Sequence, residues 1–389
     1  MNFGFTEEQG YLRETVRKWV DDRCPMAEVR RLAKTEDAFS SELWRGLAEQ
    51  GVLGLLIPES YGGAGLAWVD LVVVLEETGR TLMPSPLVST ALATQALLEA
   101  GSPAQRDAWL PRFAAGEAVA TLAVLEASDR LGTSGVALAA ERDGDVDVLR
   151  GEKRFVADVG CADVFVVAYR ADAGSGGGAG AGIAAPTNGA GPLRLALVRR
   201  EAAGVRTESI PTLDETRRSG TLRLDGVRIA PADRLEGADP EATLALLLDC
   251  GAVAVAAEGL GAAEGALALT VRYANDRVQF GSPIGRYQGV KHRLADMWVD
   301  TESVKSLLYY AAWSIDERRD VLPRYASLAK AYLSDAFTRL GVDCVQLHGA
   351  VGYTIEYDIQ LYLKRSKWVR PTFGDGDFHR DRLATLQGL

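Results

Sequence analysis

Side chains that bind metals or form disulfides are scarce in this sequence, which has three histidines and four cysteines among 389 residues. His292, His348 and His379 lie far apart without the H-E-x-x-H spacing of zinc hydrolases, and no G-x-x-x-x-G-K-[ST] segment occurs. The cysteines are widely spaced and form no C-x-x-C pair, which argues against a disulfide framework or a zinc site. We therefore expect no bound metal, no P-loop chemistry and a reducing, cytoplasmic location.

Positive charge and uninterrupted apolar runs are also lacking. The formal charge is −10 at pH 7, and the clustered lysines and arginines that neutralise phosphates are absent, so we expect no nucleic-acid partner. The basic pairs Arg30-Arg31 and Arg217-Arg218 are interpreted as solvated faces. The longest apolar run, LALLLDCGAVAVAA, contains Asp249 and is too short to cross a bilayer, and no basic segment followed by an apolar one opens the chain. We expect no membrane association.

Hydrophobic residues make up 47% of the chain, which is enough for two or three packed domains. Residues 6 to about 115 have helical periodicity, with a capping box at Thr6 and Gln9 and a second helix that begins near Trp68. From about 119 to 232, short alternating runs rich in Val and Leu predict strands. Residues 240 to about 389 return to long helical periodicity. We predict domains at 1–116, 117–235 and 236–389.

A Gly/Ala-rich stretch at residues 172–191 interrupts the β-region. It contains G-x-G-x-G, but no helix signal follows, which disfavours a dinucleotide-binding loop. With few large apolar groups to pack, it is interpreted as a disordered hairpin loop.

Two long segments, RVQFGSPIGRYQGVKHRLADM at 277–297 and QLHGAVGYTIEYDIQLYLKRSK at 346–367, resemble the acyl-CoA dehydrogenase family. PESYGGAGL and GEKRFVADVGCADVFVVA extend the resemblance over essentially the whole chain. The resemblance implies an α+β fold with an N-terminal helical domain, a central β-domain and a C-terminal four-helix bundle. It also implies a tetramer, an FAD cofactor and an acyl-CoA substrate in fatty acid and lipid metabolism.

The chemistry implied by the resemblance is dehydrogenation at Cα–Cβ of a thioester. A carboxylate removes the α-proton while a hydride leaves the β-carbon for flavin N5. Each enzyme subunit of the family holds FAD between its β-domain and its C-terminal helices, and a neighbouring subunit contacts the pyrophosphate and adenine. Electrons usually pass to electron-transfer flavoprotein.

The positions that match the family's contacts to a neighbour's FAD are preserved. They are Arg277, Phe280, Gln288, Gln346, Gly349 and Gly352. Arg277 can pair with pyrophosphate, Phe280 can stack on adenine, and the glycines allow close backbone approach. The alternatives are that Arg277 is a surface charge, that Phe280 is a core aromatic, and that Gln288 and His292 lie on a helix surface.

The positions that cradle a subunit's own flavin are altered. Where the family usually has T-E-P-x-A-G-S-D, this chain has L-E-A-S-D-R at residues 125–130. Where the family has Trp-x-Thr-Asn, this chain has Phe155, Val156, Ala157 and Asp158. Ala157 cannot hydrogen-bond a flavin, whereas Phe155 can either stack on one or belong to the β-domain core.

The catalytic base of the family is missing from both positions that supply it. The usual glutamate before a glycine falls on Phe373, and the alternative position on the long preceding helix falls near Gly251. A one-residue shift would bring Asp375 before Gly376 as a substitute base. Alternatively, Asp375, Asp377 and His379 form a polar turn, with Asp377 as the N-cap of the last helix.

Three functions follow from these residues. The first is that of a base-lacking subunit of a heteromeric acyl-CoA dehydrogenase, paired with a paralogue and acting on a bulky or branched acyl-CoA. Alternatively, it is a homotetrameric flavoenzyme with Asp375 as base. A third alternative is a non-catalytic acyl-CoA-binding protein of the same fold.

Overall fold

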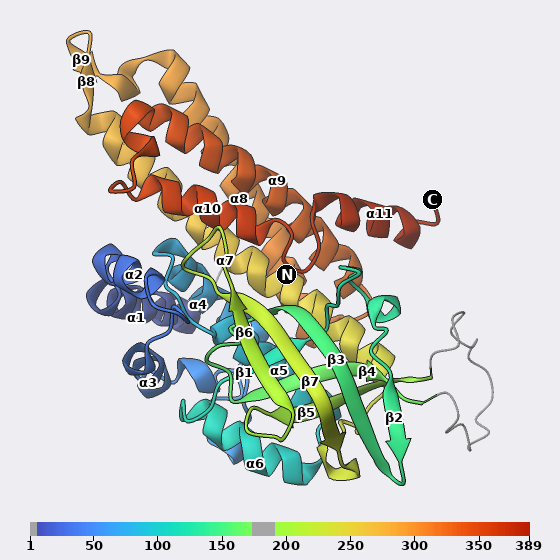
Figure 1. Ribbon diagram of the computed structural model, residues 1–389. Coiled ribbons are helices and arrows are strands. Elements are labelled where there is room, and N and C mark those ends of the chain that lie inside the picture. Colours follow the sequence, from blue (N-terminus) through green and yellow to red (C-terminus); the bar gives the residue numbers. More distant parts are fainter. Residues whose placement is uncertain (1–5, 173–190) are drawn as a thin grey trace.

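The computed structural model describes residues 6–172 and 191–389 (Figure 1). The low-complexity stretch at 172–191 therefore lies, apart from its two ends, outside the described residues. Helices precede and follow a central set of strands, which confirms the predicted α+β architecture. The predicted domain limits stay a prediction.

The N-terminal part is helical. Its helices are α1 (Glu7–Arg23), α2 (Met26–Ala33), α3 (Ser41–Glu49), α4 (Trp68–Arg80), α5 (Leu87–Ala100) and α6 (Pro103–Ala114). The capping box is confirmed, because the Thr6 hydroxyl accepts from the Gln9 amide and the Gln9 side chain accepts from the Thr6 amide. The start of α4 at Trp68 is also as predicted.

The central strands form two sheets. The first has the order β1 (Ala120–Ala123), β4 (Val164–Arg170) and β5 (Leu193–Arg199). The second has the order β2 (Ala140–Asp143), β3 (Val146–Ala157), β7 (Ser219–Ile229) and β6 (Val205–Ile210). β1 is parallel to β4, and the other pairings in both sheets are antiparallel. Strands β2 and β6 were not predicted, because both are short and mostly polar.

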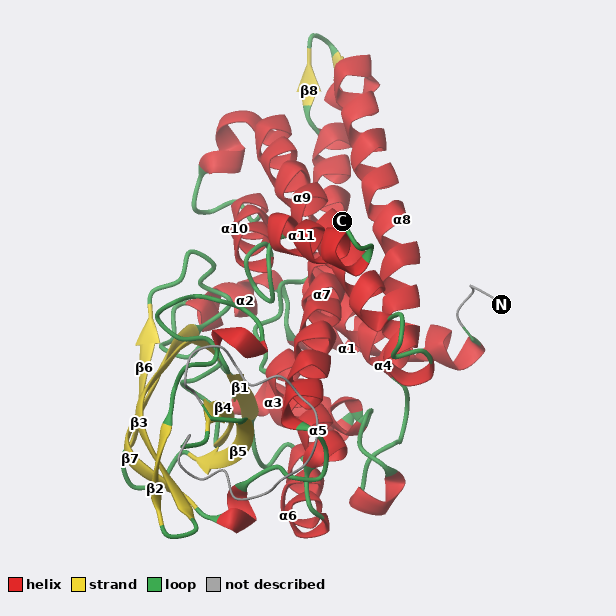
Figure 2. Cartoon of the chain, turned by 90° about the vertical axis from the view of Figure 1, so that its right-hand side faces the viewer, coloured by secondary structure: helices red, strands yellow, loops and turns green. Residues whose placement is uncertain are grey.

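The C-terminal part is a bundle that projects beyond the sheets (Figure 2). It contains α7 (Pro240–Asp276), α8 (Gln288–Glu317), α9 (Leu322–His348), α10 (Ile359–Val369) and α11 (Gly376–Leu386). A short hairpin of β8 (Val278–Gln279) and β9 (Ser282–Pro283) forms the far end of the bundle (Figure 1).

Helix α7 is the central helix of the bundle. By length and composition it is the one described helix that could cross a membrane, but 83% of its apolar stretch is buried within the structure. It contacts α4, α5, α8, α9 and α10. Gly261 permits the close approach of α4, since a Cβ at this position would lie 1.9 Å from the Glu76 carbonyl oxygen. The apolar run is thus explained by burial in the core.

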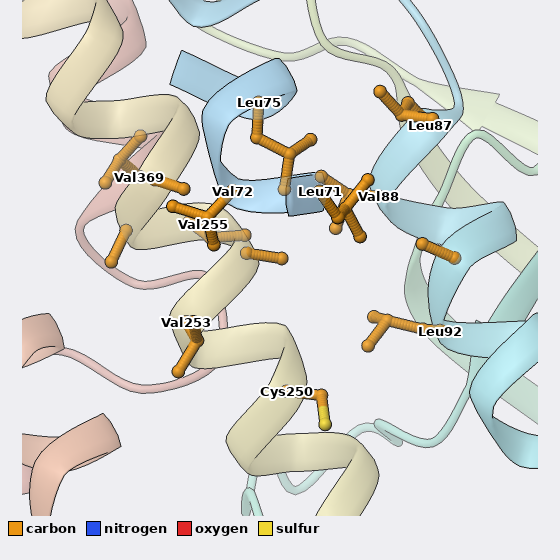
Figure 3. Packing of buried hydrophobic residues seen from close by; sticks show 14 of the residues in the cluster. Leu71, Val72, Leu75, Leu87, Val88, Leu92, Cys250, Val253, Val255 and Val369 are labelled. Carbon is orange, nitrogen blue, oxygen red and sulfur yellow. The ribbon is translucent and has the colours of Figure 1, made fainter. Parts of the chain in front are cut away.

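The core joins the N-terminal helices to α7. Leu71, Val72 and Leu75 of α4 lie near Val88 and Leu92 of α5 and near Val253 and Val255 of α7 (Figure 3). Burying such side chains stabilises the fold by roughly 1.5–3 kcal/mol each. This packing fixes α5 and α7, which both border the cavity described next.

Candidate active site

A cavity of about 650 Å³ lies between the β-region, α5, α7 and the segment from α10 to α11. Its apolar lining residues include Val88, Leu92, Leu122, Val124, Val255, Trp368 and Phe373. The ionisable residues on its wall are Asp129, Arg154, Asp158, Asp214, Arg217, Arg218, Lys367 and Asp375. A cavity of this size with a mainly apolar lining suits an organic ligand with a hydrophobic part.

Both base positions meet at one place in this cavity. Phe373 lines the cavity, and its ring covers Gly251, where an added Cβ would lie 2.4 Å from the ring edge. A glycine is therefore required beneath the ring, and the ring fills the space that a side chain from α7 would enter. Neither position offers a group that can accept a proton.

Asp375 also lines the cavity, but it serves as the N-cap of α11. Its Oδ1 accepts a hydrogen bond of 2.9 Å from the Phe378 amide. The prediction that Asp377 caps this helix is wrong by two residues: Asp377 lies inside the first turn and pairs with Arg380 at 2.7 Å. The Gly374–Asp375 turn ends the loop early, so the helix begins at Gly376.

The half of the cavity that should hold the chain's own flavin does not present the usual donors. Ala157 lines it without a hydroxyl. The Asp158 carboxylate accepts a 2.6 Å hydrogen bond from Ser89, and burial raises its pKa although nearby Arg217 opposes this shift. Phe155 is 52% exposed and lines the cavity, so it is not a β-domain core residue. These residues do not fit a flavin ring held by hydroxyl and amide groups.

Glu126 is the glutamate that the L-E-A-S-D-R segment shares with the family motif, and its hydrogen-bond partners are residues of the β-region and its loops. Its carboxylate accepts hydrogen bonds from the backbone amides of Ala137 and Leu138. It also accepts one of 2.6 Å from the buried Lys153 ammonium. Its oxygens are thus committed to holding the 137–138 segment against β3.

A buried ion network lies beside the cavity. Arg217 is 4% exposed and contacts the Glu258 carboxylate, so its interpretation as a solvated residue is wrong. Arg365 donates to Asp214 at 2.5 Å and lies 3.6 Å from Glu258. Burial, followed by the charge of Arg365, lowers the pKa of Arg217 to about 10. Both guanidinium groups lie over the ring of Trp368, on the cavity wall.

The sequence reasoning missed this network and the buried Lys330 on α9. The available signal was a single charged residue inside an apolar helical run. Glu258 occurs in AVAVAAEGLGAA and Lys330 in SLAKAYL. A charge in such a run must be paired when it is buried.

The residues predicted to contact a neighbour's FAD lie away from the cavity, at the far end of the bundle and its hairpin (Figure 1). Phe280 is 94% exposed, which excludes a core role in the isolated chain. Arg277 directly follows α7 and is exposed, and Gln288 begins α8. Gln346 accepts a 2.9 Å hydrogen bond from Arg293. The hairpin therefore presents an aromatic face to whatever covers it.

The glycine turn lies at the same end of the bundle. Gly349 has φ +62°, a conformation that glycine adopts readily, and directly follows α9. Gly352 is buried, and a Cβ there would lie 2.6 Å from the Val345 carbonyl oxygen. His292 lines a separate hollow of about 360 Å³ between α8 and α9 with Arg293, Asp296 and Asp343. Within the described ranges, no three His, Cys, Asp or Glu residues are placed to hold a metal.

A helical domain, a β-domain and a helical bundle around one apolar cavity define the class of fold. Residues 6–117 match "Acyl-CoA dehydrogenase, N-terminal domain" and residues 242–386 match "Acyl-CoA dehydrogenase, C-terminal domain". The chain is 32% identical to acyl-CoA dehydrogenase IpdE2 of Mycobacterium tuberculosis over 361 residues, covering 92% of this chain and 91% of that protein. The chain belongs to the acyl-CoA dehydrogenase family.

Solved structures give the same result. The Tcur3481-Tcur3483 steroid ACAD variant is 31% identical with a TM-score of 0.85, and 98% of each chain is covered. The ChsE4-ChsE5 complex of Mycobacterium tuberculosis is 28% identical with a TM-score of 0.87, covering 100% of this chain and 99% of that one. The family consists of FAD-dependent oxidoreductases that act on the CH–CH bond of acyl-CoA thioesters.

Proposed function

We propose that the chain is a base-lacking subunit of a heteromeric acyl-CoA dehydrogenase, paired with a paralogous subunit that retains the glutamate. The observation that carries this proposal is the Phe373 ring packed over Gly251 in the cavity. Proton removal from the α-carbon needs a positioned base, and neither of the two positions that supply it in the family can do so here. Similarity to two chains described as parts of two-component assemblies supports the pairing.

In this proposal the chain contributes to the FAD of its partner. Bound FAD supplies the hydride acceptor of the reaction. Arg277 would pair with the pyrophosphate and Phe280 would stack on adenine. Gln288, Gln346, Gly349 and Gly352 would line the same surface, while Phe155 faces the chain's own cavity. Electron-transfer flavoprotein as acceptor, a heterotetramer, a bulky acyl-CoA and a cytoplasmic location complete the proposal.

Flavin content tests the proposal directly. The chain purified alone is expected to hold well below one FAD per chain, because residues 125–130 and Ala157 lack the side chains with which the family holds a subunit's own flavin. Co-expression with a paralogue that keeps the Glu-Gly pair is expected to give stable flavin, about one FAD per pair of chains, and turnover of acyl-CoA. The visible absorption spectrum measures the FAD content of both preparations. About one FAD per chain in the isolated protein would contradict the proposal.

A second candidate function, a homotetrameric flavoenzyme, rests on the position of Asp375 on the cavity wall. Asp375→Asn separates the two, because asparagine caps a helix about as well as aspartate and the fold should be kept. We expect unchanged turnover in the complex and an unchanged melting temperature. A loss of about a hundredfold or more in kcat, with the same melting temperature, would instead identify Asp375 as the base.

A further inference from the structure

The loop between α10 and α11 forms one wall of the cavity and includes Phe373 and Asp375. Phe373 has φ +57°, in the left-handed region that costs about 1–2 kcal/mol for a residue with a Cβ. Such a conformation persists only where the surrounding structure holds it. The bonds that hold this loop come from buried residues behind it, on the side away from the cavity.

Lys330 is the first of these residues. It is fully buried on α9, and its ammonium donates to the carbonyl oxygens of Val369, Arg370 and Gly374 at 2.9, 2.9 and 2.7 Å. The Ser334 hydroxyl oxygen lies 3.0 Å from the same nitrogen, so its three N–H donors are shared among four oxygen atoms. Two of these carbonyls end α10, where a cation also complements the helix dipole. One side chain therefore links the end of α10 to the residue after Phe373.

His379 is the second. Its Nε2 lies 2.9 Å from the Phe373 carbonyl oxygen and its Nδ1 lies 3.1 Å from the Ser327 hydroxyl. A carbonyl can only accept, so Nε2 bears the proton and Nδ1 accepts from Ser327. Burial, followed by the charge of Lys330, lowers the pKa of His379 to about 3, which keeps the ring neutral at physiological pH.

We infer that Lys330, together with His379, positions Phe373: by holding the carbonyl oxygens of Phe373 and Gly374, the two residues keep the ring across Gly251 and so set the acyl-binding space of the cavity. Neither Lys330 nor His379 lines the cavity. Both act through the loop and are positioning residues. The part of this inference that concerns acyl groups rests on the proposed function, whereas the part that concerns the loop does not.

The charge on Lys330 gives the loop a pH-dependence. Burial lowers the pKa of Lys330 to about 7. The Asp375 and Asp335 carboxylates favour its charged form, whereas Arg370, which directly follows α10, disfavours it. The other titratable groups nearby are His379, which is neutral, and the paired Arg382 and Asp249. Opening the loop to water would return this pKa toward the ordinary value of a lysine, so the open loop binds more protons than the closed one above about pH 7. The closed loop is therefore least stable below about pH 7 and becomes more stable as the pH rises above it.

Hydrogen exchange of the full chain tests the positioning role. In Lys330→Met, amides of residues 370–378 are expected to exchange about tenfold faster than in the unaltered chain, since a bond to a charged donor is lost. Exchange elsewhere in the bundle should not change. Lys305→Met is the matched control, because Lys305 on α8 pairs with Glu264 and Glu302 at 2.7 Å rather than with the loop. Equal loop exchange in Lys330→Met and the unaltered chain, or faster exchange throughout the bundle, overturns the inference.

A pH series adds a readout that a purely structural role would not give. After correction for intrinsic exchange, loop exchange should fall above about pH 7 in the unaltered chain and stay level in Lys330→Met. The same fall in both forms overturns the role of Lys330. If Lys330→Met does not fold, His379→Phe keeps a buried ring and removes the hydrogen bonds to Phe373 and Ser327. Unchanged loop exchange in that variant likewise overturns the inference.

Thioester binding tests the effect on the cavity. Affinities for butyryl-CoA and the bulkier cyclohexanecarbonyl-CoA are compared in Lys330→Met, Phe373→Ala and the double variant. If Lys330 acts through Phe373, Lys330→Met changes the ratio of the two affinities, but has no further effect once Phe373 is alanine. Additive effects overturn the link to Phe373. If no form binds either thioester while loop exchange responds as expected, the part of the inference that concerns acyl groups fails and the loop assignment stands.

Discussion

Phe373→Glu is expected to raise the rate at which the chain exchanges the α-protons of a bound acyl-CoA with solvent deuterium by about a hundredfold or more. The substitution places a carboxylate where the structure has a phenyl ring, on a loop already held by Lys330 and His379. Gly251 lies beneath position 373 and has no side chain, which leaves room for the glutamate side chain. Deuterium incorporation is read by mass spectrometry of the thioester and does not require bound flavin.

The matched control is Phe373→Gln, which has the size of glutamate and cannot accept the proton. We expect exchange in this variant to stay at the level of the unaltered chain. Equal exchange in the Gln and Glu variants would mean that the loop does not direct position 373 at the α-carbon. Fast exchange in the unaltered chain would mean that another residue, with Asp375 the first candidate, already acts as a base.

Glu258→Ala is expected to lower the free energy of unfolding by about 3–5 kcal/mol, because it leaves two buried guanidinium groups without their shared carboxylate. The Glu258 side chain is 1% exposed, and those of Arg217 and Arg365 are 5% and 0% exposed. Arg365 keeps Asp214 as a partner, whereas Arg217 loses the carboxylate it contacts. Urea unfolding followed by circular dichroism measures the loss.

Two comparisons separate charge pairing from simple loss of a side chain. Glu302→Ala removes an exposed carboxylate that is 2.7 Å from Lys305 and should lower the free energy of unfolding by at most about 1 kcal/mol. Glu258→Met with Arg217→Met removes both charges and should recover much of the loss. If Glu258→Ala destabilises no more than Glu302→Ala, the buried network does not stabilise the fold.

The sequence predicted the order of elements well because that order depends on local patterns. Helical periodicity, the Thr6–Gln9 capping box and the alternating strands depend on residues close in the chain. The exceptions are instructive: β2 and β6 are polar edge strands whose pairing comes from the partners β3 and β7. The N-cap of α11 was misplaced because an Asp at 375 and an Asp at 377 are equivalent in local pattern, and the loop geometry selects the first.

The features of the site likewise fall into those that the sequence determined and those that the tertiary structure decided. Sequence alone determined which groups are present: Phe373 and Gly251 are not bases, and Ala157 is not a hydrogen-bond donor, wherever they lie. Only the tertiary structure decided that Phe373 lies on Gly251, that Arg217 is buried against Glu258, and that Lys330 and His379 hold the loop. These contacts join residues 39 or more positions apart in most cases, such as Lys330 with Val369. Composition fixes the chemistry a residue can do, whereas its burial, its partners and its charge depend on which distant segments the fold brings beside it.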